Sequence, residues 1–262
     1  MAEMLKLFNV ATPPRYPSLC ITGQTGVGKT TLVSTMPGKG LIIDIPVTEG
    51  GAFVIPTKRI HRIQGVTMET WADLDEIYWA LAKQDEEKLP GVKELDWVAI
   101  DSITGMANLA REKILSERDS RARTPDHQIA LNEWGFIGNL VGWQVPKFQR
   151  LPYAIVWVAQ ERTHGGYDDD PGPVQLGPAI TRAALMLLKP PMTIMGRLSV
   201  EGERERRVLT VGPPGGDYIV KVRAMPGRNL PNRIRDPHLG QILRYLFKDG
   251  PRPKAAREDS IF

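Results

Sequence analysis

Apolar residues occur in short, almost unbroken runs through the first 160 residues of the chain, and segments with helical spacing separate these runs. Runs rich in β-branched and aromatic residues are typical of strands that are buried on both faces of a sheet. Strands and helices that alternate along a chain indicate an α/β fold with a mainly parallel sheet. The predicted strands span residues 18–22, 40–45, 97–101 and 153–159.

Two longer segments repeat apolar residues at helical spacing. In residues 70–83, Thr70 and Asp73 have the spacing of an N-terminal capping pair. Residues 128–149 form a second predicted helix. We expect an interruption near Pro146, because proline has no backbone N–H to donate.

The character of the chain changes from residue 192 to residue 223, where glycine and proline turns separate short strands. This pattern predicts an antiparallel extension of the same sheet. The sequence therefore predicts one domain over residues 15–248, preceded by an N-terminal segment, 1–14, and followed by a flexible tail, 249–262.

The composition fits a single folded domain of 262 residues, of which 42% are hydrophobic. No apolar run approaches the roughly 18 residues that a membrane span needs, and the N-terminus lacks a signal-peptide cleavage pattern. Cys20 is the one cysteine, which excludes an intrachain disulfide and fits a reducing compartment. We therefore expect a cytoplasmic protein without a membrane partner.

The net charge of +4 is unevenly distributed. Residues 221–262 contain ten Lys or Arg against four Asp or Glu, so the basic excess is confined to this segment. Such a segment is typical of a phosphate-binding surface that contacts nucleic acid, and equally of a solvated basic surface without a partner.

The segment ITGQTGVGKTTL, residues 21–32, joins the first predicted strand to a helix. Gly23, Gly28, Lys29 and Thr30 satisfy the P-loop pattern G-x-x-x-x-G-K-[ST]. Glycines let backbone N–H groups approach a phosphate chain at the positive end of the helix dipole. The alternative is a glycine turn without a ligand. The residues predicted to bind ATP are Gly23, Gln24, Thr25, Gly26, Val27, Gly28, Lys29, Thr30 and Thr31.

Two further groups fit a nucleotide complexed with Mg²⁺. Lys29 is expected to reach the β- and γ-phosphates, and the Thr30 hydroxyl is expected to ligate the metal. The predicted strand in DWVAIDSITGM ends at Asp101, whose carboxylate is expected to hold the same ion. The alternative for Asp101 is a cap on the next helix.

The P-loop, the strand VAIDS and the strand IVWVAQERT together resemble the ATPase core of bacterial RecA and archaeal RadA recombinases. The resemblance covers most of the chain and implies a RecA-like P-loop NTPase core. It implies that Gln160 senses the γ-phosphate and that Glu49, in LIIDIPVTEGG, is the catalytic glutamate. Glu49 lies farther from Asp44 than the family pattern places it.

The resemblance also implies a head-to-tail homo-oligomer. IVKVRAMPG is similar to the basic motif that reaches a neighbour's ATP, which makes Lys221 and Arg223 trans-acting residues. LFNVAT places Phe8 and Ala11 in the F-x-x-A arrangement that docks one protomer on the next. The alternatives are two exposed basic residues on an edge strand, and packing of Phe8 on its own core.

Two segments correspond by position to the loops with which RecA-like proteins bind single-stranded DNA. Residues 168–170 are three aspartates, which count against phosphate binding in the second loop. The last residues, 258–262, are faintly similar to the tail with which single-strand-binding proteins recruit partners. The residues predicted to contact DNA are Arg118, Arg121 and Arg123 in the first loop, and Arg162, His164 and Tyr167 in the second.

Minimal chains of this kind resemble bacteriophage RecA-like ATPases that act in single-strand annealing or strand pairing. The resemblance therefore implies a Mg²⁺-dependent ATPase that acts on single-stranded DNA in recombination. Two alternatives stay open. One is a nucleotide-dependent helicase loader or packaging accessory, and the other is a P-loop kinase of small molecules.

Overall fold

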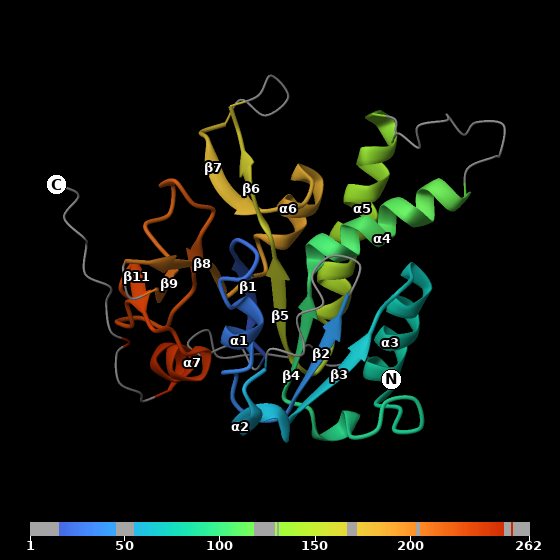
Figure 1. Cartoon of the computed structure of the whole chain (residues 1–262), viewed down its shortest axis with the longest axis horizontal. Coiled ribbons are helices and arrows are strands. Elements are labelled where there is room, and N and C mark those ends of the chain that lie inside the picture. The colour runs from blue at the N-terminus through green and yellow to red at the C-terminus, as the bar shows by residue number, and fades with distance from the viewer. Residues whose placement is uncertain are drawn as a thin grey trace, which may run out of the picture.

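The computed structural model describes residues 16–45, 55–117, 129, 131–166, 172–202, 205–248 and 253. Within these residues, a nine-stranded sheet has helices on both faces, and a separate two-stranded sheet lies beside it (Figure 1). The strands of the large sheet are β1 (Ser18–Thr22), β2 (Gly40–Asp44), β3 (Ile63–Thr67), β4 (Trp97–Asp101), β5 (Ala154–Ala159), β8 (Ile194–Glu201), β9 (Arg206–Thr210), β10 (Lys221–Val222) and β11 (Arg233–Arg235).

The sheet has the order β11-β9-β8-β1-β5-β4-β2-β3, and β10 pairs with β8 off this path. From β8 to β3 all neighbours are parallel, whereas β9, β10 and β11 pair antiparallel. This arrangement confirms the predicted α/β fold with an antiparallel extension from the C-terminal part of the chain. β5 lies between β1 and β4, so the ends of these three strands are neighbours at one edge of the sheet.

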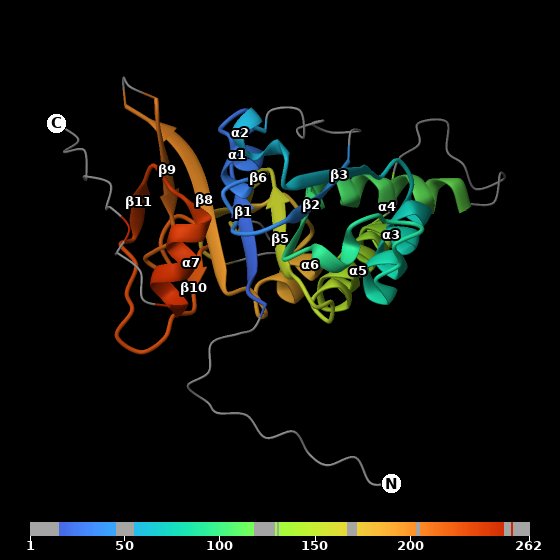
Figure 2. The same cartoon turned by 90° about the horizontal axis from the view of Figure 1, so that it is seen from below.

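The helices are α1 (Lys29–Val33), α2 (Thr57–Ile60), α3 (Trp71–Lys83), α4 (Ile103–Glu117), α5 (Leu131–Phe148), α6 (Arg182–Leu188) and α7 (Leu239–Phe247), with a 3-10 turn, η2 (Val92–Glu94). One hydrophobic cluster joins the sheet to α3, α4, α5 and α6, and a second joins its other face to α1 and α7. Figure 2 shows α3, α4 and α5 grouped at one end of the sheet, and β9, β11 and α7 at the other.

The two predicted helices are present. Thr70 and Asp73 form the expected capping box at the start of α3. The interruption expected at Pro146 is wrong, because α5 continues through this residue to Phe148. Pro146 lies in the last turn, where it removes one hydrogen bond, and the fully buried Val145 and Phe148 hold that turn in place.

A hairpin of β6 (Glu161–His164) and β7 (Gln175–Pro178) forms the small sheet directly after β5. The resemblance places the second DNA-binding loop here, and the described residues of this segment form a paired antiparallel ladder. None of the helices in the described part of the chain is long and apolar enough to cross a membrane. The predicted segment 1–14 lies outside the described residues.

Candidate functional site

The P-loop joins the end of β1 to the first residue of α1, and two of its glycines are constrained by the structure around them. A Cβ on Gly23 would lie 2.4 Å from the carbonyl oxygen of Leu198, and a Cβ on Gly28 would lie 2.5 Å from Nε of Arg207. Gly28 also has φ 93°, in the left-handed region that favours glycine. The loop therefore packs against the backbone of β8, which excludes a side chain at Gly23, and the left-handed φ disfavours any other residue at Gly28.

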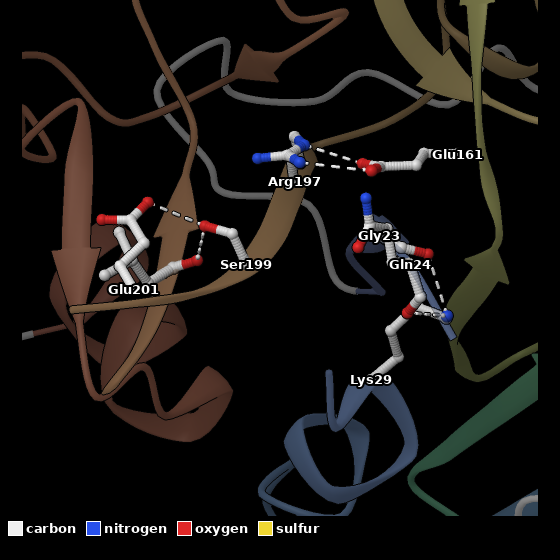
Figure 3. Close-up of polar contacts among 8 residues, drawn as sticks. Gly23, Gln24, Lys29, Glu161, Arg197, Ser199 and Glu201 are labelled. Carbon is white, nitrogen blue, oxygen red and sulfur yellow. Dashed lines mark hydrogen bonds and ion pairs between the residues drawn. The ribbon is translucent and has the colours of Figure 1, made fainter. Parts of the chain in front are cut away.

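The Lys29 side chain lies inside the curve of the P-loop. Its ammonium donates to the carbonyl oxygens of Gly23 at 2.9 Å and Gln24 at 2.8 Å (Figure 3). Only 4% of the residue is exposed. A buried cation inside a loop at a helix N-terminus is the charge distribution that a phosphate chain requires.

Thr30 and Asp101 meet at the same edge of the sheet, although they are 71 residues apart in the sequence. The Thr30 hydroxyl donates to Oδ2 of Asp101 at 2.6 Å, and both residues are buried. Hydroxyl and carboxylate oxygens are ligands that Mg²⁺ prefers. The two side chains therefore fit a magnesium ion shared with the phosphates of a bound nucleotide.

Gln160 follows the last residue of β5, the strand between the P-loop strand and the Asp101 strand. Its backbone N–H donates to the hydroxyl of Thr104 at 3.1 Å, which fixes it to the first turn of α4. The position predicted to sense the γ-phosphate therefore lies between Lys29 and Asp101 along this edge.

A buried ion pair behind the P-loop was not predicted. Arg197 of β8 donates from Nε to Oε2 of Glu161 at 2.7 Å and from Nη2 to Oε1 at 3.2 Å (Figure 3). The side chains are 17% and 8% exposed, respectively. Burial acts to lower the pKa of the Arg197 guanidinium, but the hydrogen bond and charge of Glu161 outweigh it, so the pKa is raised. Because Arg197 is opposite Thr22, the pair joins the P-loop end of the sheet to the first residue of β6.

A second unpredicted contact is made by Arg207 of β9, whose Nε donates to the carbonyl oxygen of Val27 at 3.1 Å. This guanidinium therefore lies against the P-loop backbone. No local sequence pattern marks either Arg197 or Arg207, because each contacts a residue that lies far away in the sequence. The prediction of an antiparallel extension was the nearest indication that this part of the chain adjoins the P-loop.

Lys221 and Arg223 lie far from the P-loop of their own chain. Lys221 pairs with Met195 near the start of β8, whereas the P-loop follows the end of the parallel strand β1. Both side chains donate to the carbonyl oxygen of Pro190, at 2.6 and 2.7 Å respectively. Burial, and then the charge of Arg223, lower the pKa of Lys221. Within one chain, Lys221 and Arg223 therefore fix the position of the segment that follows α6.

The residues predicted to contact DNA have different environments. Arg162 is exposed on β6. His164 is 5% exposed, and its Nε2 lies 2.8 Å from the carbonyl oxygen of Pro178. The ring of His164 is therefore packed inside the hairpin, and its predicted contact with DNA stays a prediction. The predicted residues that lie outside the described part of the chain are Phe8, Ala11, Glu49, Arg118, Arg121, Arg123, Tyr167 and the aspartates 168–170.

A family model described as an AAA domain, AAA_24, matches residues 15–218, which include the P-loop, Asp101, Gln160 and the Glu161–Arg197 pair. No curated protein matches the chain. The match covers most of the chain, and the geometry of Lys29, Thr30 and Asp101 is that of a nucleotide site. The chain therefore belongs to the AAA_24 family and is a P-loop NTPase.

Proposed function

We propose that the protein binds and hydrolyses ATP with Mg²⁺ while acting on single-stranded DNA, in strand annealing or pairing during recombination. The observation that carries the nucleotide part is the arrangement of Lys29 inside the P-loop and Thr30 against Asp101. A bound Mg²⁺ supplies charge neutralisation at the phosphate oxygens. Lys29 binds the β- and γ-phosphates, and Gln160 orients the terminal phosphate or the attacking water.

The DNA part is supported by the continuity of Gln160 with the β6–β7 hairpin. Gln160 is followed at once by Glu161, the first residue of β6, and the exposed Arg162 comes next. When the γ-phosphate is bound or lost, a movement of Gln160 therefore shifts Arg162, which lies only two residues further along the chain. Together with the resemblance to RecA and RadA, this continuity favours single-stranded DNA as the partner that responds to ATP.

Assembly completes the proposal. Lys221 and Arg223 lie toward the edge of the sheet opposite their own P-loop, which suits residues that act on a neighbour. In a head-to-tail ring or filament they replace their contacts with Pro190 by contacts with the neighbour's phosphates. Phe8 and Ala11 provide the docking arm of this assembly, and Glu49 provides the base that activates water.

The experiment is to measure ATP turnover and particle size with and without single-stranded DNA. We expect DNA to raise turnover or to promote oligomers in the wild type. Lys29→Ala should lower turnover by at least about a hundredfold, because it removes the cation that balances the phosphates. Lys113→Ala, on the exposed side of α4, is the matched control and should behave as the wild type. A monomer that ignores DNA and phosphorylates a nucleoside would refute the proposal.

A second candidate function is a nucleotide-dependent interaction module, such as a helicase loader. It is favoured by large apolar side chains on α5 and α6 that face solvent: Phe136, Trp143 and Met186 are 61%, 64% and 68% exposed, respectively. Contiguous apolar patches on a surface often mark protein contacts, and these three side chains come from two helices that pack together. ATP turnover that does not respond to DNA, together with nucleotide-dependent oligomers, would favour this function.

A further inference from the structure

A second concave site begins where the P-loop ends. It is a pocket of about 410 Å³. Thr31 and Leu32 of α1 form one wall, Arg207 of β9 forms another, and the turn between β11 and α7 supplies Asp236 and His238. A volume of this size is in the range of small-ligand sites.

The pocket is continuous with the P-loop through two residues. Thr31 directly follows the Thr30 that contacts Asp101. Arg207 lines the pocket and also donates to the carbonyl oxygen of Val27 within the loop. Because Lys29 and Asp101 mark where the β- and γ-phosphates bind, the rest of a nucleotide must leave the loop in another direction. The pocket beside Thr31 adjoins the loop and offers room for that part of the nucleotide.

Hydrogen bonds hold the walls of the pocket in place. The Leu239 N–H, at the start of α7, donates to Oγ1 of Thr35 in the segment after α1, at 2.8 Å. The backbone N–H of Asp236 donates to the carbonyl oxygen of Arg207 at 2.9 Å. These bonds tie the turn after β11 to both other walls. The fold itself therefore holds the walls of the pocket together.

Asp236 has φ 48°, a left-handed conformation that aspartate adopts more often than most residues other than glycine. Glycine would take this conformation more easily, yet the chain carries a carboxylate there. The side chain is 69% exposed and its Oδ2 lies 3.5 Å from Nε of Arg235, so the carboxylate is paired on one side and open to solvent on the other.

His238 supplies the second polar group. Its ring nitrogen accepts a hydrogen bond from the backbone N–H of Gln241, so the ring caps α7. Burial, and then the charge of Arg59, lower the pKa of the imidazole, which keeps it neutral at neutral pH. A neutral imidazole offers a flat face for stacking and a second nitrogen for a hydrogen bond. The guanidinium of Arg207 offers a second flat face.

We propose that this pocket is the nucleoside subsite of the chain, which takes the base and ribose of the triphosphate held by the P-loop. Asp236 and His238 are its polar contacts, and Arg207 joins it to the phosphates. The inference rests on the proposed binding of a nucleoside triphosphate. It adds the residues that distinguish a nucleotide from a bare phosphate chain.

The test compares the affinity for MgATP with that for magnesium tripolyphosphate, which has the phosphates but no nucleoside. The variants are Asp236→Asn and His238→Asn, because asparagine tolerates left-handed φ and is a good helix cap. We expect each variant to lose about tenfold in affinity for MgATP and to keep the wild-type affinity for tripolyphosphate. A tenfold loss corresponds to ~1.4 kcal/mol.

Asp75→Asn and His61→Asn, which replace residues outside the pocket, are the matched controls and should bind both probes as the wild type does. The inference is overturned if the two pocket variants bind MgATP like the wild type, or if they lose affinity for both probes. It is also overturned if the wild type binds tripolyphosphate as tightly as MgATP. A wild type that binds neither probe would instead refute the proposed function.

Discussion

Gly23 and Gly28 show why the phosphate loop could be predicted from sequence. Gly23 lacks the room for a Cβ, Gly28 has a left-handed φ, and both belong to one short motif, so the requirement is visible locally. The role of Arg207 could not be predicted in this way. Its contact with Val27 joins residues 180 positions apart, and no local pattern announces it. Residue roles set by backbone conformation were predictable, whereas those set by distant contacts were not.

His238 gives a residue-scale prediction about pH. Because the folded chain lowers its pKa below the usual 6.5, the unfolded chain takes up a proton more readily. The free energy of unfolding is therefore unaffected by titration of His238 above about pH 6.5, and it decreases as the pH falls below that value. Protonation also removes the lone pair that caps α7 and adds charge near Arg59, Arg62 and Arg244. The carboxylate of Asp236 lines the same pocket as His238.

The measurement is the free energy of urea unfolding between about pH 8 and pH 5. We expect His238→Asn to lose less stability on acidification than the wild type, because asparagine caps the helix without titrating. His61→Asn, at an exposed histidine, should follow the wild-type curve. Equal pH dependence in the wild type and His238→Asn would contradict this explanation.

At the scale of elements, the strands that form the centre of the sheet were predicted because their residues are almost all buried. β3 was missed because three of its five positions are exposed, so it has no apolar run. α7 was missed although six of its nine residues are buried, because a helix this short depends on packing more than on propensity. The β6–β7 hairpin was missed because β6 is largely polar and is held by pairing with β7.

The Glu161–Arg197 pair gives an element-scale prediction, since it fastens the start of β6 to β8. Arg197→Ala and Glu161→Ala should each lower the free energy of unfolding by about 3 kcal/mol, because each leaves a largely buried charge without its partner. The double variant should lose less than the sum of the two. Urea unfolding measures all three.

The exposed Lys113–Glu117 pair of α4 is the comparison for this double-mutant cycle. Its removal should change stability little, because water already solvates both charges. Additive losses at Glu161 and Arg197 would show that the two side chains act independently, contrary to the geometry of the ion pair.

At the scale of the whole molecule, the strand order assembles the site. β1, β5 and β4 are neighbours, so the P-loop, Gln160 and Asp101 meet although they are widely separated in sequence. The sequence allowed the strands and the residues at their ends to be predicted, which is why these three parts were identified. It did not show which other segments close around them. The pocket beside Thr31 and the contacts of Lys221 with the segment after α6 therefore emerged only from the fold.

The most direct test of the central claim is a calorimetric titration of ATP into the wild type and Lys29→Ala, with and without Mg²⁺. Our account predicts saturable binding of one ATP per wild-type chain, tighter with Mg²⁺, and at least about tenfold weaker in Lys29→Ala. Absence of ATP binding by the wild type, or equal affinity in the two proteins, would contradict it.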